Sequence, residues 1–192
     1  MRCFACLVPP MGVRCLVSSR LEPFRRAFRS VKWVREELMH VTLLFLGEVP
    51  RSEAESFGHR LRDVADSYPP INLSLGGMGA FPSVRSPRAI WVGLGGELDV
   101  LSSFAERVAR CAPGGGGERF VPHMTVGRVR DGEALGEALD EAGLWEVSFE
   151  GDKVCAFSVC EVVLMESHLG PGGPRYVPFR RYPLVGLRFG GC

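Results

Sequence analysis

Short apolar runs and alternating apolar and polar positions recur along the chain and predict strands. The run at residues 2–8 is mostly apolar, which is typical of a buried strand. Residues 71–75 instead alternate, with Ile71, Leu73 and Leu75 on one face, as in a half-buried strand. The same reasoning predicts further strands at 31–35, 38–47, 89–94, 120–129, 145–149, 153–166 and 176–189.

Apolar residues that recur every three or four positions predict four helices between these strands. The first covers residues 13–28, with Pro23 as a break or restart, and the second opens on a capping box at Ser52-Glu53-Ala54-Glu55. The third covers 98–108, and the fourth covers 134–139 and ends at Gly143. Turns are predicted at 76–88 and 170–174, and a flexible loop at 113–117.

One short pattern occurs twice, 83 residues apart: His40-Val41-Thr42-Leu43 and His123-Met124-Thr125-Val126. The chain has four histidines and only two threonines, and both threonines lie two residues after a histidine. Chance would produce this in roughly one chain in 3,000. Since strand side chains alternate between faces, each motif presents its histidine and its threonine on the same face. If the two strands are neighbours, two imidazoles and two hydroxyls converge.

This set of side chains suits transfer of a phosphoryl group without a metal. One imidazole can take a proton from an attacking water while the other gives a proton to a leaving alkoxide, because an ordinary histidine pKa lies near 6.5. The two hydroxyls can donate hydrogen bonds to the non-bridging oxygens of a phosphate between them.

The order of elements around the two motifs indicates an internal duplication. A strand, a helix, a strand, a motif strand and a helix occur in sequence around the first motif, and this order is partly echoed around the second. No glycine-rich strand-to-helix turn marks a doubly wound parallel sheet. We therefore expect one α+β domain over residues 1–192, with two pseudo-symmetric lobes facing a shared central cleft and helices on the outside.

The duplicated motif resembles the 2H phosphoesterase superfamily. Its flanks are similar to those of the RNA 2′,3′-cyclic phosphodiesterases, historically called 2′-5′ RNA ligases, in four stretches: residues 38–49, 79–82, 119–129 and 167–176. The resemblance implies two largely antiparallel sheets that face each other. It also implies hydrolysis of 2′,3′-cyclic phosphodiesters to 2′-phosphomonoesters, with no cofactor and no metal.

The same resemblance implies a role for each site residue. His40 would be the proton donor and His123 the proton acceptor, while Thr42 and Thr125 would orient the phosphate. The fifth residue after each histidine is Phe45 in the first motif and Arg128 in the second. Arg128 would contact phosphate and Phe45 could stack on a base. Strict alternation points both away from the histidines, so only a strand end or a bulge would bring them back.

Composition changes this picture little. The net charge of +1 gives no sign of nucleic-acid binding, and the excess of arginine, 21 of 23 basic residues, is attributed to genomic base composition. No apolar run of about 20 residues could span a membrane, and the apolar run at residues 3–8 is too short for a secretory signal, so we expect a cytoplasmic protein. Seven cysteines is an odd number, and a cytoplasmic setting argues against a disulfide framework. We expect a monomer that binds RNA with 2′,3′-cyclic phosphate ends or small cyclic nucleotides.

Three other functions remain open on sequence alone. The first is the reverse reaction, ligation of RNA ends through a 2′-5′ linkage, which the same residues would catalyse. The second is a metal hydrolase, although no carboxylate or third histidine lies at a ligand-like spacing from either motif. The third is a protein that binds RNA ends without turnover. His168 could line the cleft, and Trp33, Trp91 and Trp145 are expected in the core.

Overall fold

The computed structural model describes residues 1–113, 119–130, 133–171 and 173–187. In chain order these residues form the following elements: β1 (Arg2–Leu7), α1 (Met11–Ala27), β2 (Lys32–Trp33), the 3₁₀ turn η1 (Glu36–Leu38), β3 (Val41–Glu48), α2 (Arg51–Asp66), β4 (Ile71–Pro82), β5 (Pro87–Gly96), α3 (Leu98–Arg110), β6 (His123–Arg128), α4 (Glu133–Glu141), the 3₁₀ turn η2 (Leu144–Glu146), β7 (Ala156–Val159), β8 (Glu161–Gly170) and β9 (Gly173–Pro183).

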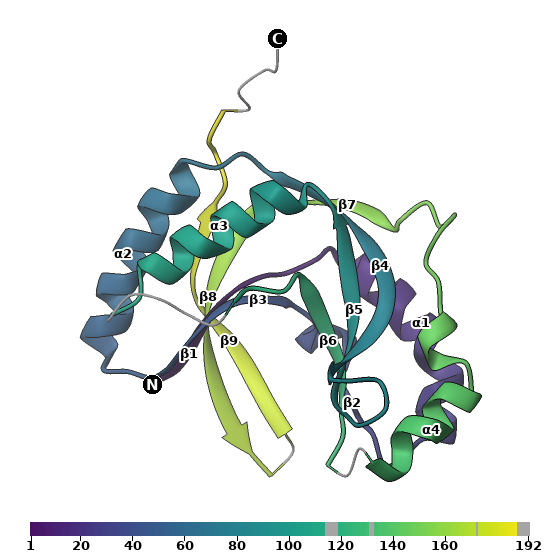
Figure 1. Ribbon diagram of the computed structural model, residues 1–192. Helices are drawn as coiled ribbons and strands as arrows, with labels where there is room; N and C mark the ends of the chain where they lie inside the picture. The colour runs from purple at the N-terminus through teal and green to yellow at the C-terminus, as the bar shows by residue number, and fades with distance from the viewer. Residues whose placement is uncertain (114–118, 131–132, 172, 188–192) are drawn as a thin grey trace.

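The strands form two sheets, each carrying one motif strand (Figure 1). One sheet has the order β3-β1-β8-β9 and the other has the order β2-β6-β5-β4-β7. All strand pairs are antiparallel. Helix α2 packs against β8 and β9 of the first sheet, and α4 packs against β5 of the second. The predicted α+β class with two antiparallel sheets is therefore confirmed.

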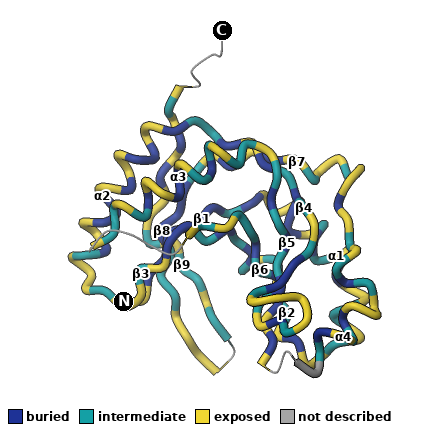
Figure 2. The backbone as a smooth tube through the Cα atoms, in the orientation of Figure 1, coloured by how far each residue is buried: buried dark blue, intermediate teal, exposed yellow. Residues whose placement is uncertain are grey.

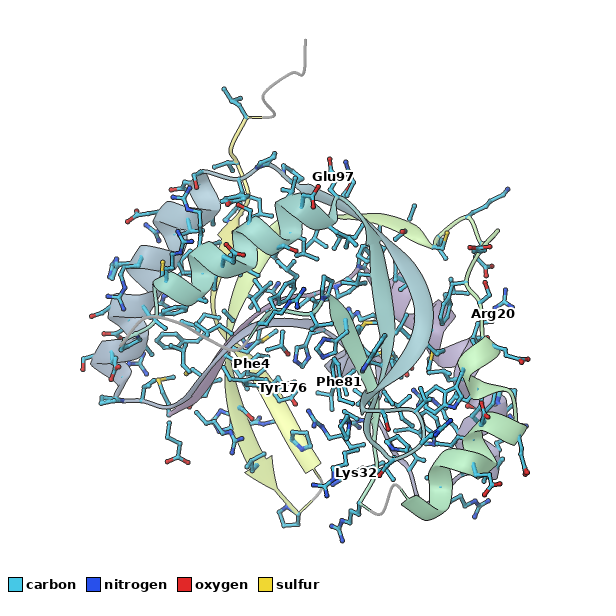
Figure 3. The ribbon with its side chains drawn as sticks, in the orientation of Figure 1. Phe4, Arg20, Lys32, Phe81, Glu97 and Tyr176 are labelled. Carbon is cyan, nitrogen blue, oxygen red and sulfur yellow. The ribbon has the colours of Figure 1, made fainter. Side chains whose placement is uncertain are left out.

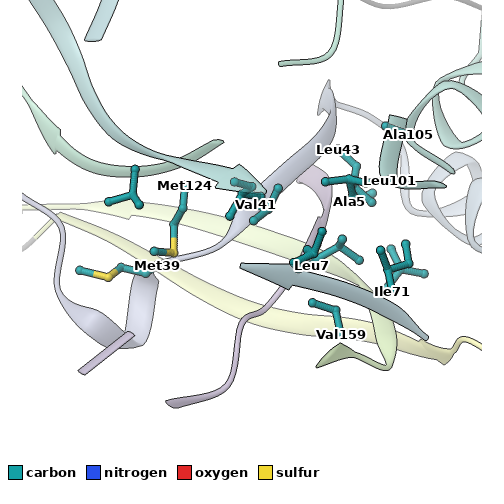
Figure 4. Packing of buried hydrophobic residues seen from close by; sticks show 14 of the residues in the cluster. Ala5, Leu7, Met39, Val41, Leu43, Ile71, Leu101, Ala105, Met124 and Val159 are labelled. Carbon is teal, nitrogen blue, oxygen red and sulfur yellow. The ribbon is translucent and has the colours of Figure 1, made fainter. Parts of the chain in front are cut away.

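A continuous hydrophobic core joins the two sheets at the motif strands. Strands β3 and β6 contact each other although they belong to different sheets. Val41 and Leu43 of β3 and Met124 and Val126 of β6 are buried in the same cluster, part of which is drawn in Figure 4. Figure 2 shows that buried positions gather where the elements face one another. Because the apolar residues of each motif are held in this core, the intervening histidine and threonine face the other side.

Two helix predictions are wrong in part: the predicted break inside the first helix and the predicted cap at the start of the second. Helix α1 continues through Pro23 without a break, since Leu21 is buried and Phe24 also packs against the core on the far side of the proline. Burial of this apolar face offsets the backbone hydrogen bond that a proline removes. The capping box is not formed, because α2 begins at Arg51 after Pro50 and has no side-chain cap. Ser52 therefore lies inside the first turn.

Several strand predictions also need correction. Residues 145–149 are not a strand, because a left-handed glycine, Gly143, leads into η2 instead. Residues 76–82, predicted as a turn, continue β4, with a register irregularity between Leu75 and Met78. The predicted strand at 153–166 is two strands that meet at Cys160, and the one at 31–35 shrinks to β2. The last strand ends at Pro183, and its predicted end at Phe189 and most of the glycine loop lie outside the described residues.

The cysteines of the N-terminal strand face opposite ways, as alternation requires. Cys3 is buried in the large core and Cys6 in a small separate cluster with Phe4 and Val163. Six of the seven cysteines are described, and all six are free thiols. Among the described residues, no helix is long and apolar enough to cross a membrane.

Candidate active site

The two motif histidines have the same local geometry. His40 lies between η1 and β3, and its Nδ1 is 2.7 Å from the carbonyl oxygen of Leu38. His123 begins β6, and its Nδ1 is 2.7 Å from the carbonyl oxygen of Val121. A carbonyl only accepts, so Nδ1 carries the hydrogen in both rings. Each Nε2 is then the atom that takes up or releases a proton, which is the arrangement that acid-base catalysis needs.

A bulge follows the threonine in both motif strands. Against β1, Thr42 pairs with Cys6 and Leu44 with Ala5, so one extra residue, Leu43, lies between them. Against β5, Thr125 pairs with Trp91 and Gly127 with Ile90, so Val126 is the extra residue. A bulge puts two consecutive side chains on one face and reverses the alternation beyond it. Residues five positions after each histidine therefore return to the histidine face.

Arg128 and Phe45 both lie on this face. The positive charge of Arg128 acts to lower the pKa of His40, His123 and Tyr176, so its guanidinium is near enough to act on residues of both motifs. Phe45 is 64% exposed, and its ring centroid is 5.8 Å from that of Phe4. The side chain of Arg128 can meet a phosphate held by the motif residues, and the exposed ring of Phe45 is available for stacking.

Each histidine ring is framed by two aromatic rings. The centroids of Phe4 and Tyr176 lie 4.9 and 5.3 Å from that of His40, and the Tyr176 ring meets it edge-on at 89°. The centroids of Phe81 and Trp91 lie 5.0 and 6.1 Å from that of His123, and the Phe81 ring also meets it edge-on at 89°. Figure 3 labels Phe4 and Tyr176 of the first sheet, whose ring centroids lie 4.9 Å apart, and Phe81 of the second sheet. The rings therefore restrict the orientation of both imidazoles.

These aromatic neighbours are the site residues that sequence reasoning missed. The sequence predicts Trp91 only as a core residue and Phe4 only as part of a buried strand. Phe81 and Tyr176 lie in two of the stretches that resemble the family, at 79–82 and 167–176, which is a signal for them. Trp91 and Phe4 are identified only by strand register, which pairs Trp91 with Thr125 and Phe4 with Phe45. His168, in contrast, lies on β8 with its Nε2 3.6 Å from Glu166. No described contact links it to either motif.

Burial changes the proton affinity of both histidines. It is the main cause that lowers the pKa of His40 from 6.5 to about 4, against the hydrogen bond to Leu38; the charge of Arg128, and that of His123 when it is protonated, lower it further. Burial, with Arg128, also lowers the pKa of His123. Both imidazoles are therefore neutral near pH 7 in the unliganded protein. A bound anion such as phosphate raises both pKa values again, because it favours the charged form.

The packing of Trp91 beside His123 depends on a glycine in the neighbouring strand. A side chain at Gly79 of β4 would overlap the Trp91 ring, whereas one at Gly77 of the same strand would meet no atom within 4 Å. We expect Gly79→Ala to lower the free energy of unfolding by about 1–3 kcal/mol, the usual cost of overpacking. Gly77→Ala is the matched control. Urea denaturation with tryptophan fluorescence measures both, and equal stability of the two variants would contradict this packing.

Two hollows lie elsewhere on the surface. One of about 550 Å³ is lined by Ser52, Ser56, Arg60 and Arg110, where α2 begins and α3 ends. One of about 270 Å³ lies between α2 and β9, beside His59. Neither contains a motif residue, so the candidate site is identified by its chemistry rather than by a hollow. Within the described residues, no group of three or more histidine, cysteine, aspartate or glutamate side chains could hold a metal ion.

Comparison with known proteins agrees with this geometry. Residues 16–171 match the family model described as 2′-5′ RNA ligase superfamily. A protein of Archaeoglobus fulgidus named RNA 2′,3′-cyclic phosphodiesterase is 34% identical over 78% of this chain and 82% of its own. A protein of the same name from Methanothermobacter thermautotrophicus is 32% identical over 90% of this chain and 93% of its own.

Solved structures show the same fold. The crystal structure of TT0787 of Thermus thermophilus superposes with a TM-score of 0.70 at 26% identity, covering 98% of this chain and all of that one. Escherichia coli LigT complexed with 3′-AMP superposes with a TM-score of 0.70 at 22% identity, covering 96% of this chain and 98% of LigT. The match spans both motifs and both sheets, and the chain belongs to the 2′-5′ RNA ligase superfamily, a group of 2H phosphoesterases.

Proposed function

We propose that this protein hydrolyses 2′,3′-cyclic phosphodiesters, on RNA ends or on nucleotides, to 2′-phosphomonoesters. The observation that supports this most directly is the matched pair of histidines, each tied at Nδ1 to a backbone carbonyl, with Arg128 acting on both. The relatives named RNA 2′,3′-cyclic phosphodiesterase support the same reaction. They favour hydrolysis over ligation and over binding without turnover.

In the proposed reaction, Nε2 of His123 takes a proton from water, and the water oxygen forms a bond to phosphorus. The bond between phosphorus and the 3′-oxygen breaks, and Nε2 of His40 gives its proton to that oxygen. The product carries a 2′-phosphate and a free 3′-hydroxyl. The hydroxyls of Thr42 and Thr125 and the guanidinium of Arg128 stabilise the charge on the non-bridging oxygens. Phe45 stacks on the base.

The test is hydrolysis of adenosine 2′,3′-cyclic phosphate in the presence of EDTA, with identification of the phosphate isomer. We expect adenosine 2′-phosphate to form at the same rate with and without the chelator. This result follows because the acid, the base and the phosphate contacts are all protein side chains. Loss of activity in EDTA, or formation of the 3′-isomer, would contradict the proposal.

The rate should depend on pH in a bell-shaped manner with a low optimum. Hydrolysis needs His123 neutral and His40 protonated, so kcat/KM falls below the lower pKa and above the higher one. Both pKa values lie below 6.5 in the free protein, so the maximum of kcat/KM lies below pH 6.5.

Substitution of Arg128 tests this account of the pH profile. Its charge lowers both histidine pKa values, so Arg128→Gln should move the whole profile to higher pH while lowering its height. Measurement of kcat/KM between about pH 4 and about pH 9 covers both limbs. An optimum above pH 7 in the wild type, or an unmoved profile in the variant, would contradict this account.

The partners that we propose are RNA with 2′,3′-cyclic phosphate ends or small cyclic nucleotides. A cytoplasmic location and a monomeric state go with this function. The six described cysteines, all unpaired, suit a reducing compartment.

A further inference from the structure

Beside the proposed site, two cations face each other across a strand pair. Lys32 of β2 pairs directly with Arg128 of β6, so their side chains project from the same face of the sheet. Arg128 shares this face with Thr125, because of the bulge at Val126. Figure 3 shows Lys32 near the edge of the site, below Phe81 in that view.

This pair has no counter-ion among the described residues. Lys32 is exposed, and neither its ammonium nor the Arg128 guanidinium takes part in a described hydrogen bond or ion pair. Like charges directly opposite each other in a sheet are destabilising. An anion bound between them or beside them would remove that repulsion, so the arrangement favours a negatively charged ligand.

The position of Lys32 relative to Arg128 suggests which anion this is. Neighbouring strands lie about 4.8 Å apart, and β2 is the edge strand next to β6. The lysine ammonium ends a flexible four-carbon stem, so it can reach a phosphate that follows the one at Arg128 along a nucleotide chain. The motif residues would bind the reacting cyclic phosphate, so the ammonium of Lys32 would be available to bind a second phosphate.

We propose that Lys32, next to Arg128, forms a subsite for a second phosphate on the 5′ side of the nucleotide that carries the cyclic phosphate. The inference rests on the proposed function and specifies its substrate. Preferred substrates carry this second phosphate, either as an internal phosphodiester of RNA or as a 5′-phosphate on a single nucleotide.

Three substrates that differ only around this phosphate test the subsite. Adenosine 2′,3′-cyclic phosphate lacks a second phosphate, its 5′-phosphorylated form has a terminal one, and the dinucleotide ApA with a 2′,3′-cyclic phosphate has an internal one. We expect Lys32→Gln to lower kcat/KM for the substrates with a second phosphate about tenfold relative to the one without, since one charge-assisted contact is lost.

A second readout is the dependence on salt. For the dinucleotide, loss of one phosphate contact should reduce the slope of log kcat/KM against log salt concentration by about 0.7. Lys32→Arg should restore both the substrate ratio and the slope. Lys153→Gln, which removes the only other lysine of the chain, exposed in the turn before β7, is the matched control and should keep the wild-type ratio.

The pattern of losses across the three substrates shows whether the subsite exists and which kind of phosphate it binds. A loss confined to the dinucleotide supports the subsite and identifies RNA as its source of phosphate, and a loss on both phosphorylated substrates supports a general phosphate subsite. An equal loss on all three substrates, or none, overturns the subsite. Failure of the wild type to hydrolyse any of the three would instead overturn the proposed function, so the two failures are distinguishable.

Discussion

Replacement of either motif histidine by alanine should abolish most of the activity. We expect His40→Ala and His123→Ala each to lower kcat/KM about 10²- to 10⁴-fold, the usual contribution of a general acid or base. Their effects should not add in the double variant, because acid and base act in one concerted step. Initial rates on adenosine 2′,3′-cyclic phosphate measure kcat/KM for the two single variants and the double variant. His59→Ala, on the exposed side of α2, is the control and should keep wild-type activity.

The residual activity of the two variants separates their roles. Loss of the proposed base in His123→Ala should remove the acidic limb of the pH profile, and loss of the proposed acid in His40→Ala should remove the alkaline limb. The opposite pattern would exchange the two roles. Wild-type rates in either variant would leave the motifs as a binding surface and contradict catalysis by the pair.

Loss of one threonine hydroxyl should have the next largest effect. Thr42→Val and Thr125→Val keep the size and β-branching of the side chain but remove the hydroxyl donor. A hydrogen bond to a charged group is worth about 1.5–3 kcal/mol, so kcat/KM should fall about 10- to 150-fold in each variant. Steady-state kinetics with adenosine 2′,3′-cyclic phosphate test this.

The matched controls are Thr42→Ser and Thr125→Ser, which keep the hydroxyl and should stay within a few-fold of the wild type. Both threonines are partly buried and alternate with core residues, so thermal unfolding of each variant checks that the strands are intact. Equal losses in the serine and valine variants would show that the loss of the hydroxyl does not by itself explain the effect, and wild-type rates in the valine variants would contradict the proposed hydrogen bonds.

Much of the fold follows from local patterns in the sequence. Strand β1 and helices α2 and α3 lie close to their predicted positions, because each buries an uninterrupted apolar face. The errors lie at positions where a local sequence signal, such as a proline or a capping box, does not decide where the helix breaks or begins. Burial of Leu21 carries α1 through Pro23, and the chain bends at Pro50, so α2 starts before the predicted cap.

For the candidate site, too, one part follows from the sequence and another part only from the structure. The pattern of His40, Thr42, His123 and Thr125 predicts the four side chains and the face that each motif presents. The structure places β3 and β6 in contact at the junction of two sheets, and Arg128 acts on both histidines there. Strict alternation points Phe45 and Arg128 away from the histidines, and the bulge that reverses this in each motif is formed in pairing with β1 or β5.

The sequence by itself determined which two segments hold the histidines and threonines that we propose as catalytic, and which face of each strand displays them. The reason is that histidine and threonine two residues apart match the two-residue period of a strand, which is a local property. Only the tertiary structure decided that Phe45 and Arg128 join that face, that aromatic rings frame the imidazoles and that Lys32 stands opposite Arg128. These features depend on strand register, which is set by pairing with β1, β2 and β5, and register cannot be known from either partner strand alone.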